Sequence, residues 1–172
     1  PQCRKRFVFL WPWGDCLWLP GMGPKQVCTI GPLQTFSLDP HLSNPMRIYF
    51  SGDSEPMVTG TASEHRTTAV KVREFLAGSG ESLVLSADTH GSPAPYTSLL
   101  KGIRVSRSDG AVSMRLSPEG EICVAGSAQN LSCWAERFVF PFESEAGHHH
   151  IDSRFDWVAP ASVGLIIEAD GA

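Results

Sequence analysis

Apolar and polar residues alternate in short runs from residue 46 onward, and turn-forming residues separate the runs. This alternation predicts strands over residues 46–50, 82–86, 102–106, 111–116 and 121–125. Ser-Asp-Gly at 108–110 is a typical turn, so we expect 102–106 and 111–116 to form a hairpin. Ser-Pro-Glu-Gly at 117–120 supplies the next turn, before the strand at 121–125. Two more strands are predicted over 148–155 and 163–168.

Two segments follow the helical period instead. In the first, Val72, Phe75 and Leu76 share one face, Thr67 or Thr68 can cap the start, and Gly78 or Gly80 can end it. The second covers residues 128–139 after a possible cap at Ser127, and its apolar stripe is Leu131, Trp134, Ala135, Phe138 and Val139. Pro141 cannot continue that helix. The pattern predicts an α+β fold, a two-layer sandwich in which two helices cover one face of a mostly antiparallel sheet.

Residues 1–45 have a different character. Prolines recur through this stretch, Trp11, Trp13 and Trp18 lie close together, and no period of a helix or strand is sustained. The apolar run after Arg4 to Arg6 is too short for a secretory signal. We therefore expect an irregular Pro/Trp-rich extension over 1–45 and a single α+β domain over 46–172. Because Met46 opens a regular strand, we also expect translation to begin there, so that 1–45 would not be natively translated.

Charge and composition narrow the functional classes. The net charge of −4 argues against a nucleic acid or an anionic membrane surface as the partner, since both favour a basic face. No apolar run approaches the roughly 20 residues of a membrane-spanning helix. None of the 5 cysteines forms a CxxC pair, and Cys123 and Cys133 fall in strand and helix patterns where cysteine is usually a small buried residue. A reducing compartment, the cytoplasm, and the absence of a cofactor are the expectations.

The C-terminal third of the chain resembles a known family. A strand ends in Val-Ala-Gly-Ser at 124–127, a helix begins with Asn-Leu at 130–131, and Gly-His-His-His-Ile-Asp at 147–152 precedes Ser-Val-Gly-Leu-Ile-Ile-Glu at 162–168. This succession resembles the immunity protein 32 family of bacterial polymorphic-toxin systems. The matching positions are Gly126, Leu131, His150, Asp152, Ser162, Leu165, Ile167 and Glu168. The resemblance implies neutralisation of a co-encoded toxin by direct binding in the bacterial cytoplasm.

The histidine triplet at 148–150 is the strongest candidate for metal chemistry. On a strand, His148, His150 and Asp152 would share one face, which permits a His-His-Asp metal site. Half-exposed strand histidines at an interface are the alternative and the favoured interpretation. A nucleophilic site built on Ser162, His90 and Asp88 lacks a GxSxG elbow, and no glycine motif for nucleotide binding is present.

Aromatic and acidic residues near the triplet predict the partner-binding surface. Trp134 and Phe138 are assigned to the core, whereas aromatics around loops can anchor an interface with an acidic rim. The predicted binding residues are Phe142, Glu143, Glu145, His148, His150, Asp152, Asp156 and Trp157. We expect an immunity-type protein, not an enzyme, that binds a cognate protein toxin stoichiometrically. A metal-dependent enzyme using His148, His150 and Asp152, and a non-catalytic accessory domain with another partner, are the alternatives.

Overall fold

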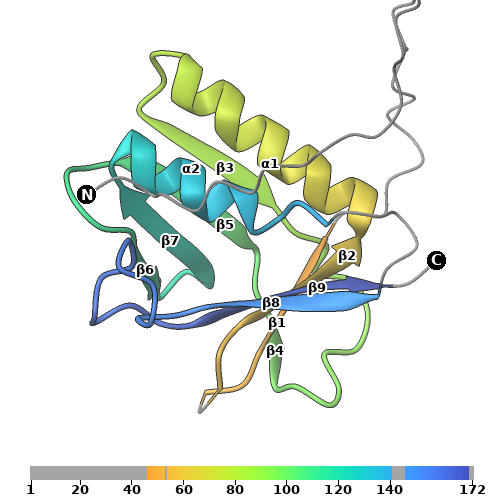
Figure 1. Ribbon diagram of the computed structural model, residues 1–172. Helices are drawn as coiled ribbons and strands as arrows, with labels where there is room; N and C mark the ends of the chain where they lie inside the picture. The colour runs from red at the N-terminus through yellow and green to blue at the C-terminus, as the bar shows by residue number, and fades with distance from the viewer. Residues whose placement is uncertain (1–45, 53, 141–145, 171–172) are drawn as a thin grey trace, which may run out of the picture. The chain divides into compact units, whose positions relative to one another are not determined.

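The computed structural model describes residues 46–52, 54–140 and 146–170 (Figure 1). The predicted extension over 1–45 and the predicted stop at Pro141 lie outside these residues. The elements in chain order are β1 Arg47–Phe50, β2 Met57–Thr61, α1 Ala62–Ala77, β3 Ser82–Ser86, β4 Ser98–Leu99, β5 Gly102–Arg107, β6 Ser113–Leu116, β7 Glu121–Gly126, α2 Ala128–Glu136, β8 Gly147–Ile151 and β9 Leu165–Asp170.

The strands form two sheets. The five-stranded sheet has the order β4-β1-β2-β9-β8, and the four-stranded sheet has the order β3-β5-β7-β6. Neighbouring strands are antiparallel except in the pairs β2–β9 and β5–β7, which are parallel. The predicted α+β class and the two helices are therefore confirmed, whereas the strands expected in one sheet are divided between two. Helix α1 contacts β2 and β9 of one sheet and β3 of the other, and α2 packs against α1 and β7 (Figure 1).

The predicted hairpin between 102–106 and 111–116 is wrong. Strand β7 lies between β5 and β6, so β5 pairs with β7 in parallel and β6 pairs with β7 across the 117–120 turn. The segment between β5 and β6 is instead tied to the end of β7, since the Ser108 amide donates to the Gly126 carbonyl and the Ser127 amide donates to the Gly110 carbonyl. The Ser-Asp-Gly turn at 108–110 is not sufficient to decide the pairing, because the parallel ladder with β7 occupies the edge of β5 that the hairpin would use.

Helix α1 begins before the predicted caps at Thr67 or Thr68. Thr61 is the N-cap: its hydroxyl accepts from the Glu64 amide, and the Glu64 carboxylate accepts from the Thr61 amide at 2.7 Å. This reciprocal capping box satisfies two helix-start donors. Strand β2, which runs directly into the helix, was not predicted. Thr67 and Thr68 are interior positions, and Thr68 is buried.

Helix α2 and the strands after it follow the predicted pattern with shifted ends. Ser127 caps α2 as expected, and Trp134 and Phe138 are core residues whose rings lie 4.9 Å apart. The helix ends at Glu136, and β8 ends at Ile151 rather than continuing to residue 155. Cys123 and Cys133 lie in β7 and α2 but are only half-buried. Neither described helix is long and apolar enough to cross a membrane.

Candidate protein-binding face

The two faces of the five-stranded sheet are not equivalent. Val58 and Ile167 face the core and are fully buried. The side-chain position of Gly60 is also on the core side, because a Cβ added there would lie 3.7 Å from the His65 ring of α1. Since side chains alternate along a strand, Met57 and Thr59 must face away from the helix. Helix α1 thus covers one face of this sheet and leaves the other face uncovered by it.

The strand registers align a row of large side chains on this second face. Leu99 lies opposite Tyr49, Tyr49 opposite Met57, Met57 opposite Ile166, and Ile166 opposite His150. The four apolar and aromatic members of the row are all half-buried rather than buried. A parallel row joins Arg47, Thr59, Glu168 and His148 by the same pairings. We call this surface the open face, and its residues are Arg47, Tyr49, Met57, Leu99, His148, His150, Ile166 and Glu168.

Tyr96 extends the open face beyond the strands. Its ring lies 5.2 Å from that of Tyr49, and its hydroxyl is 3.4 Å from the Met57 sulfur. Aromatic pairs of this kind contribute about 0.5–1.5 kcal/mol beyond their buried area. The contacts therefore hold the two tyrosine rings in place beside the apolar row.

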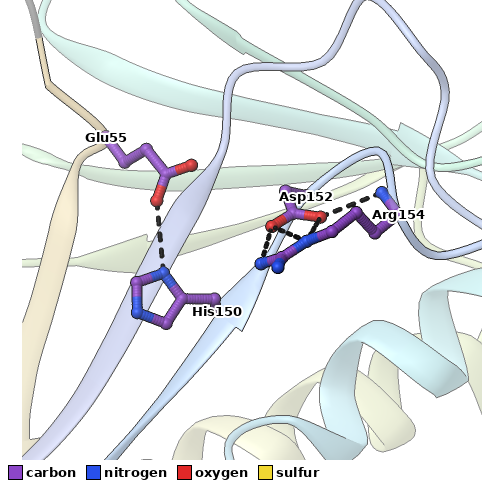
Figure 2. Close-up of polar contacts among 4 residues, drawn as sticks. All are labelled: Glu55, His150, Asp152 and Arg154. Atoms are coloured by element: carbon purple, nitrogen blue, oxygen red, sulfur yellow. Dashed lines mark hydrogen bonds and ion pairs between the residues drawn. The ribbon is translucent and has the colours of Figure 1, made fainter.

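The exposed histidines of β8 lie at the other end of the open face. The His148 and His150 rings meet edge to face with centroids 5.1 Å apart. His150 Nδ1 is 3.4 Å from a Glu55 carboxylate oxygen, as Figure 2 shows. Glu55 lies over Gly164, where an added Cβ would overlap its carboxylate. The sequence prediction that His148 and His150 share a strand face is confirmed.

Asp152 does not join the two histidines. Strand β8 ends before it, and its carboxylate accepts from the amide and the guanidinium of Arg154 (Figure 2). The hydrogen bonds from the Arg154 side chain, followed by the one from its amide, lower the pKa of Asp152 to about 2. In the part of the chain that the structure describes, no group of three or more His, Cys, Asp or Glu side chains is placed to hold a metal ion. The geometry required by the metal-enzyme alternative is thus not formed by these three residues.

A second polar cluster lies beside β1. The Asp88 carboxylate accepts from the His90 amide and from the Arg47 guanidinium, and it contacts His90 Nδ1 at 2.9 Å. These hydrogen bonds lower the pKa of Asp88 to about 2, and the bond from the His90 amide makes the largest contribution. Ser162, the nucleophile candidate that sequence reasoning disfavoured, donates to the Val112 carbonyl and accepts from the Met114 amide. Asp88 and His90 therefore contact each other, whereas Ser162 hydrogen bonds elsewhere and is not joined to them.

The predicted aromatic anchors have different surroundings. Trp157 is only 7% exposed, and it stacks on Phe155 with centroids 5.1 Å apart, so its ring belongs to the core. The Arg137 guanidinium covers Phe155 at 4.4 Å. Asp156 is exposed as expected. Phe142, Glu143 and Glu145 lie outside the described residues.

Sequence reasoning missed a fully buried histidine. His65 on α1 has no exposed surface, and its Nε2 lies 2.7 Å from the Glu168 carbonyl oxygen. Nε2 therefore carries the hydrogen, and Nδ1 is left buried without a partner among the described residues. The ring packs against Phe138 and Phe140. Burial lowers the pKa of His65 below its ordinary value, so the ring is neutral in the folded protein.

Sequence reasoning also missed the apolar part of the open face. Its signal was present in part: within 46–50, Tyr49 alternates with the buried Ile48, which places it on the opposite face. Nothing local to the sequence indicates that Tyr49, Met57 and Ile166 lie side by side. That arrangement depends on pairing between strands distant in the chain.

Comparisons with known proteins identify no relative of this chain. No protein-family model matches the chain, and neither the curated proteins nor the solved structures give a match. Functional inference therefore rests on the residues and their geometry.

Proposed function

We propose that this protein is an immunity-type protein that neutralises a cognate bacterial toxin by direct stoichiometric binding, and that the toxin binds the open face. The observation that carries the proposal is the row of half-buried apolar and aromatic side chains across the face that α1 leaves uncovered. The resemblance of the C-terminal third to immunity protein 32 supports the choice of a toxin as partner. The cytoplasm is the proposed site of action.

The composition of the open face suits a protein partner. Interfaces combine an apolar centre, often with tyrosine or methionine, and a polar rim. Here Tyr49, Met57 and Ile166 form the centre, and His148 and Glu168 lie at its border. Residues near the centre of such a patch contribute most of the binding free energy, because the surrounding groups exclude water from them.

The proposed partner-binding set differs from the one expected from sequence. His148 and His150 stay in it. Asp152 is neutralised by Arg154 and Trp157 is buried, so neither offers a free anchor on the surface. Tyr49, Met57, Leu99 and Ile166 take their place as contact residues.

The test is co-expression with the protein encoded beside this one, followed by calorimetry with purified proteins. Wild-type protein is expected to restore growth of cells that produce the toxin and to bind it in a fixed molar ratio. Tyr49→Ala and Ile166→Ser are each expected to weaken binding by about tenfold or more, the cost of truncating a central anchor. Arg115→Ala, a change of an exposed residue on the four-stranded sheet, is the matched control and should bind normally.

Two outcomes would contradict the proposal at different levels. If the wild-type protein neither protects cells nor binds the neighbouring protein, the function is wrong. If it binds, but Tyr49→Ala and Ile166→Ser bind as well as Arg115→Ala, the function stands and the open face is not the binding surface.

A further inference from the structure

Strand β3 is an open edge of the four-stranded sheet. It pairs only with β5, over all five of its residues, Ser82–Ser86. The opposite edge is different, because the segment after Trp157 covers β6: the Val112 amide donates to the Trp157 carbonyl, and the Val163 amide donates to the Met114 carbonyl. Among the described residues no such segment lies along β3.

The outward backbone groups of β3 belong to its even-numbered residues. The Ala87 amide donates to the Lys101 carbonyl, and the Leu85 carbonyl lies against Gly102. Both are odd-numbered positions directed toward β5. Because consecutive residues of a strand direct their backbone groups to opposite sides, Ser82, Val84 and Ser86 direct theirs away from the sheet. A second strand on this side would find three amides and three carbonyls available.

The side chains of β3 do nothing to discourage such pairing. Protein edge strands are commonly protected by a charge, a proline or a bulge, and Ser-Leu-Val-Leu-Ser contains none of these. Val84 is 46% exposed, and within the described ranges the other exposed large apolar residue is Val70, at 42%. Leu83 is only half-buried, although it packs against the core.

The sequence of β3 reads the same in both directions, so a second copy of this strand would present matching residue types in antiparallel register. We propose that β3 pairs antiparallel with β3 of a second copy of this chain, about a two-fold axis at Val84, so that the two four-stranded sheets become one continuous sheet. In this register Val84 lies opposite Val84 of the second copy, Ser82 opposite Ser86, and Leu83 opposite Leu85.

The register agrees with the backbone directions. Each opposed pair of even-numbered residues exchanges two hydrogen bonds, whereas Leu83 and Leu85 occupy the non-bonded position, where side chains approach more closely. The contact is self-complementary, as a two-fold interface requires. Leu83 gains a leucine neighbour, and Val84 gains a valine. This pairing involves no residue of the open face and does not depend on the proposed function.

The expected dimer is weak. A five-residue ladder is small against the roughly 1,200–2,000 Å² that stable interfaces bury. We therefore expect a reversible equilibrium between monomer and dimer that shifts with protein concentration.

Sedimentation velocity of the full chain, from low micromolar to near-millimolar concentration, tests the proposal. The wild-type protein should change from monomer to dimer as its concentration rises. Val84→Lys places two like charges opposite each other and should raise the dissociation constant at least about tenfold. Val70→Lys, on the exposed side of α1, is the matched control and should dimerise normally.

Disulfide trapping tests the register independently. Under mild oxidation Val84→Cys should form more covalent dimer than the wild-type chain, because residue 84 meets its own copy. Ser82→Cys should not, since the two copies of residue 82 lie about 13 Å apart along the strands. A wild-type monomer at every concentration, a dimer that Val84→Lys leaves unchanged, or equal trapping of both cysteine variants would overturn the proposal.

Discussion

Replacing His65 by leucine is expected to remove a loss of stability that the wild-type protein suffers as the pH falls below neutrality. The imidazole is fully buried, and its surroundings include Phe138 and Phe140. Its Nε2 hydrogen bonds to the Glu168 carbonyl, and Nδ1 has no hydrogen-bond partner among the described residues. A charged ring is therefore disfavoured in the folded state.

The direction and size of the effect follow from proton binding. Burial lowers the folded-state pKa of His65 below the ordinary value of 6.5, while the unfolded chain keeps that value. Between the two values the unfolded state binds one more proton than the folded state, so acid favours unfolding. In this interval the free energy of unfolding should fall by up to about 1.4 kcal/mol per pH unit. The contribution is fully present above pH 6.5 and is lost progressively below it.

Near pH 8 the leucine variant should differ little from the wild type. The substitution removes one hydrogen bond, a loss of about 0.5–1.5 kcal/mol, but it also removes the buried Nδ1, whose desolvation costs about 1–3 kcal/mol. The aliphatic side chain fills much of the same space. At pH 8 His65→Ala should instead lose about 3 kcal/mol, because it leaves a cavity beside two phenylalanine rings.

Urea denaturation at intervals between pH 8 and pH 5 measures these differences. Over this range Asp88 and Asp152, whose pKa values are about 2, remain ionised in the folded state and take up no proton there. His148→Leu is the matched control, because it removes an imidazole from an exposed position and leaves the buried His65 in place. Equal pH dependence in His65→Leu and the wild type would refute the assignment of the acid effect to His65.

Two further substitutions test contacts that stabilise α1, each by urea denaturation at pH 7. Arg107→Ala should lower the free energy of unfolding by about 1.5–3 kcal/mol, since the Arg107 guanidinium donates to the Phe75 and Gly78 carbonyls at the helix end. The control Arg115→Ala should change the free energy of unfolding by less than about 0.5 kcal/mol. Similar losses in both variants would contradict this role of Arg107. Thr61→Ala should cost about 1 kcal/mol by removing the N-cap, whereas Thr67→Ala should cost clearly less, and the reverse order would place the cap where sequence reasoning expected it.

Local signals account for the parts of the fold that sequence reasoning predicted. The strands at 82–86 and 121–125 are short, largely apolar runs, and turn-forming residues flank each strand. Ser127 directly precedes the apolar stripe of α2. Neighbouring residues therefore suffice to define each of these elements. Strand β2 has no such signal: it contains Gly60, and it passes into α1 without a turn. Helix α1 was placed too late because its first turn is held by Thr61 and Glu64, while the apolar residues used to find it lie further along.

Pairing between distant strands accounts for most of what sequence reasoning missed. The β5–β7 ladder is parallel and brings residue 102 beside residue 121, so the turn at 108–110 does not connect sheet neighbours. The open face likewise requires β1, β2, β9 and β8 to assemble before its residues meet. His148 and His150 were found because they lie two residues apart on one strand, whereas Tyr49 and Ile166 are brought together only by the fold. Trp157 was expected at the surface because it lies near a loop and a strand end, but the fold buries it.

The two proposed contacts lie on different sheets and predict a specific combined behaviour. The open face uses β1, β2, β4, β8 and β9, whereas self-pairing uses β3 of the four-stranded sheet, and the two sets share no residue. A dimer joined through β3 would therefore carry two open faces, and each could bind one partner molecule. Val84→Lys should convert a two-to-two complex at high concentration into a one-to-one complex without changing the affinity of a single face. If Val84→Lys weakened partner binding as strongly as Tyr49→Ala does, the two surfaces would be coupled, and the division of roles between the sheets would be wrong.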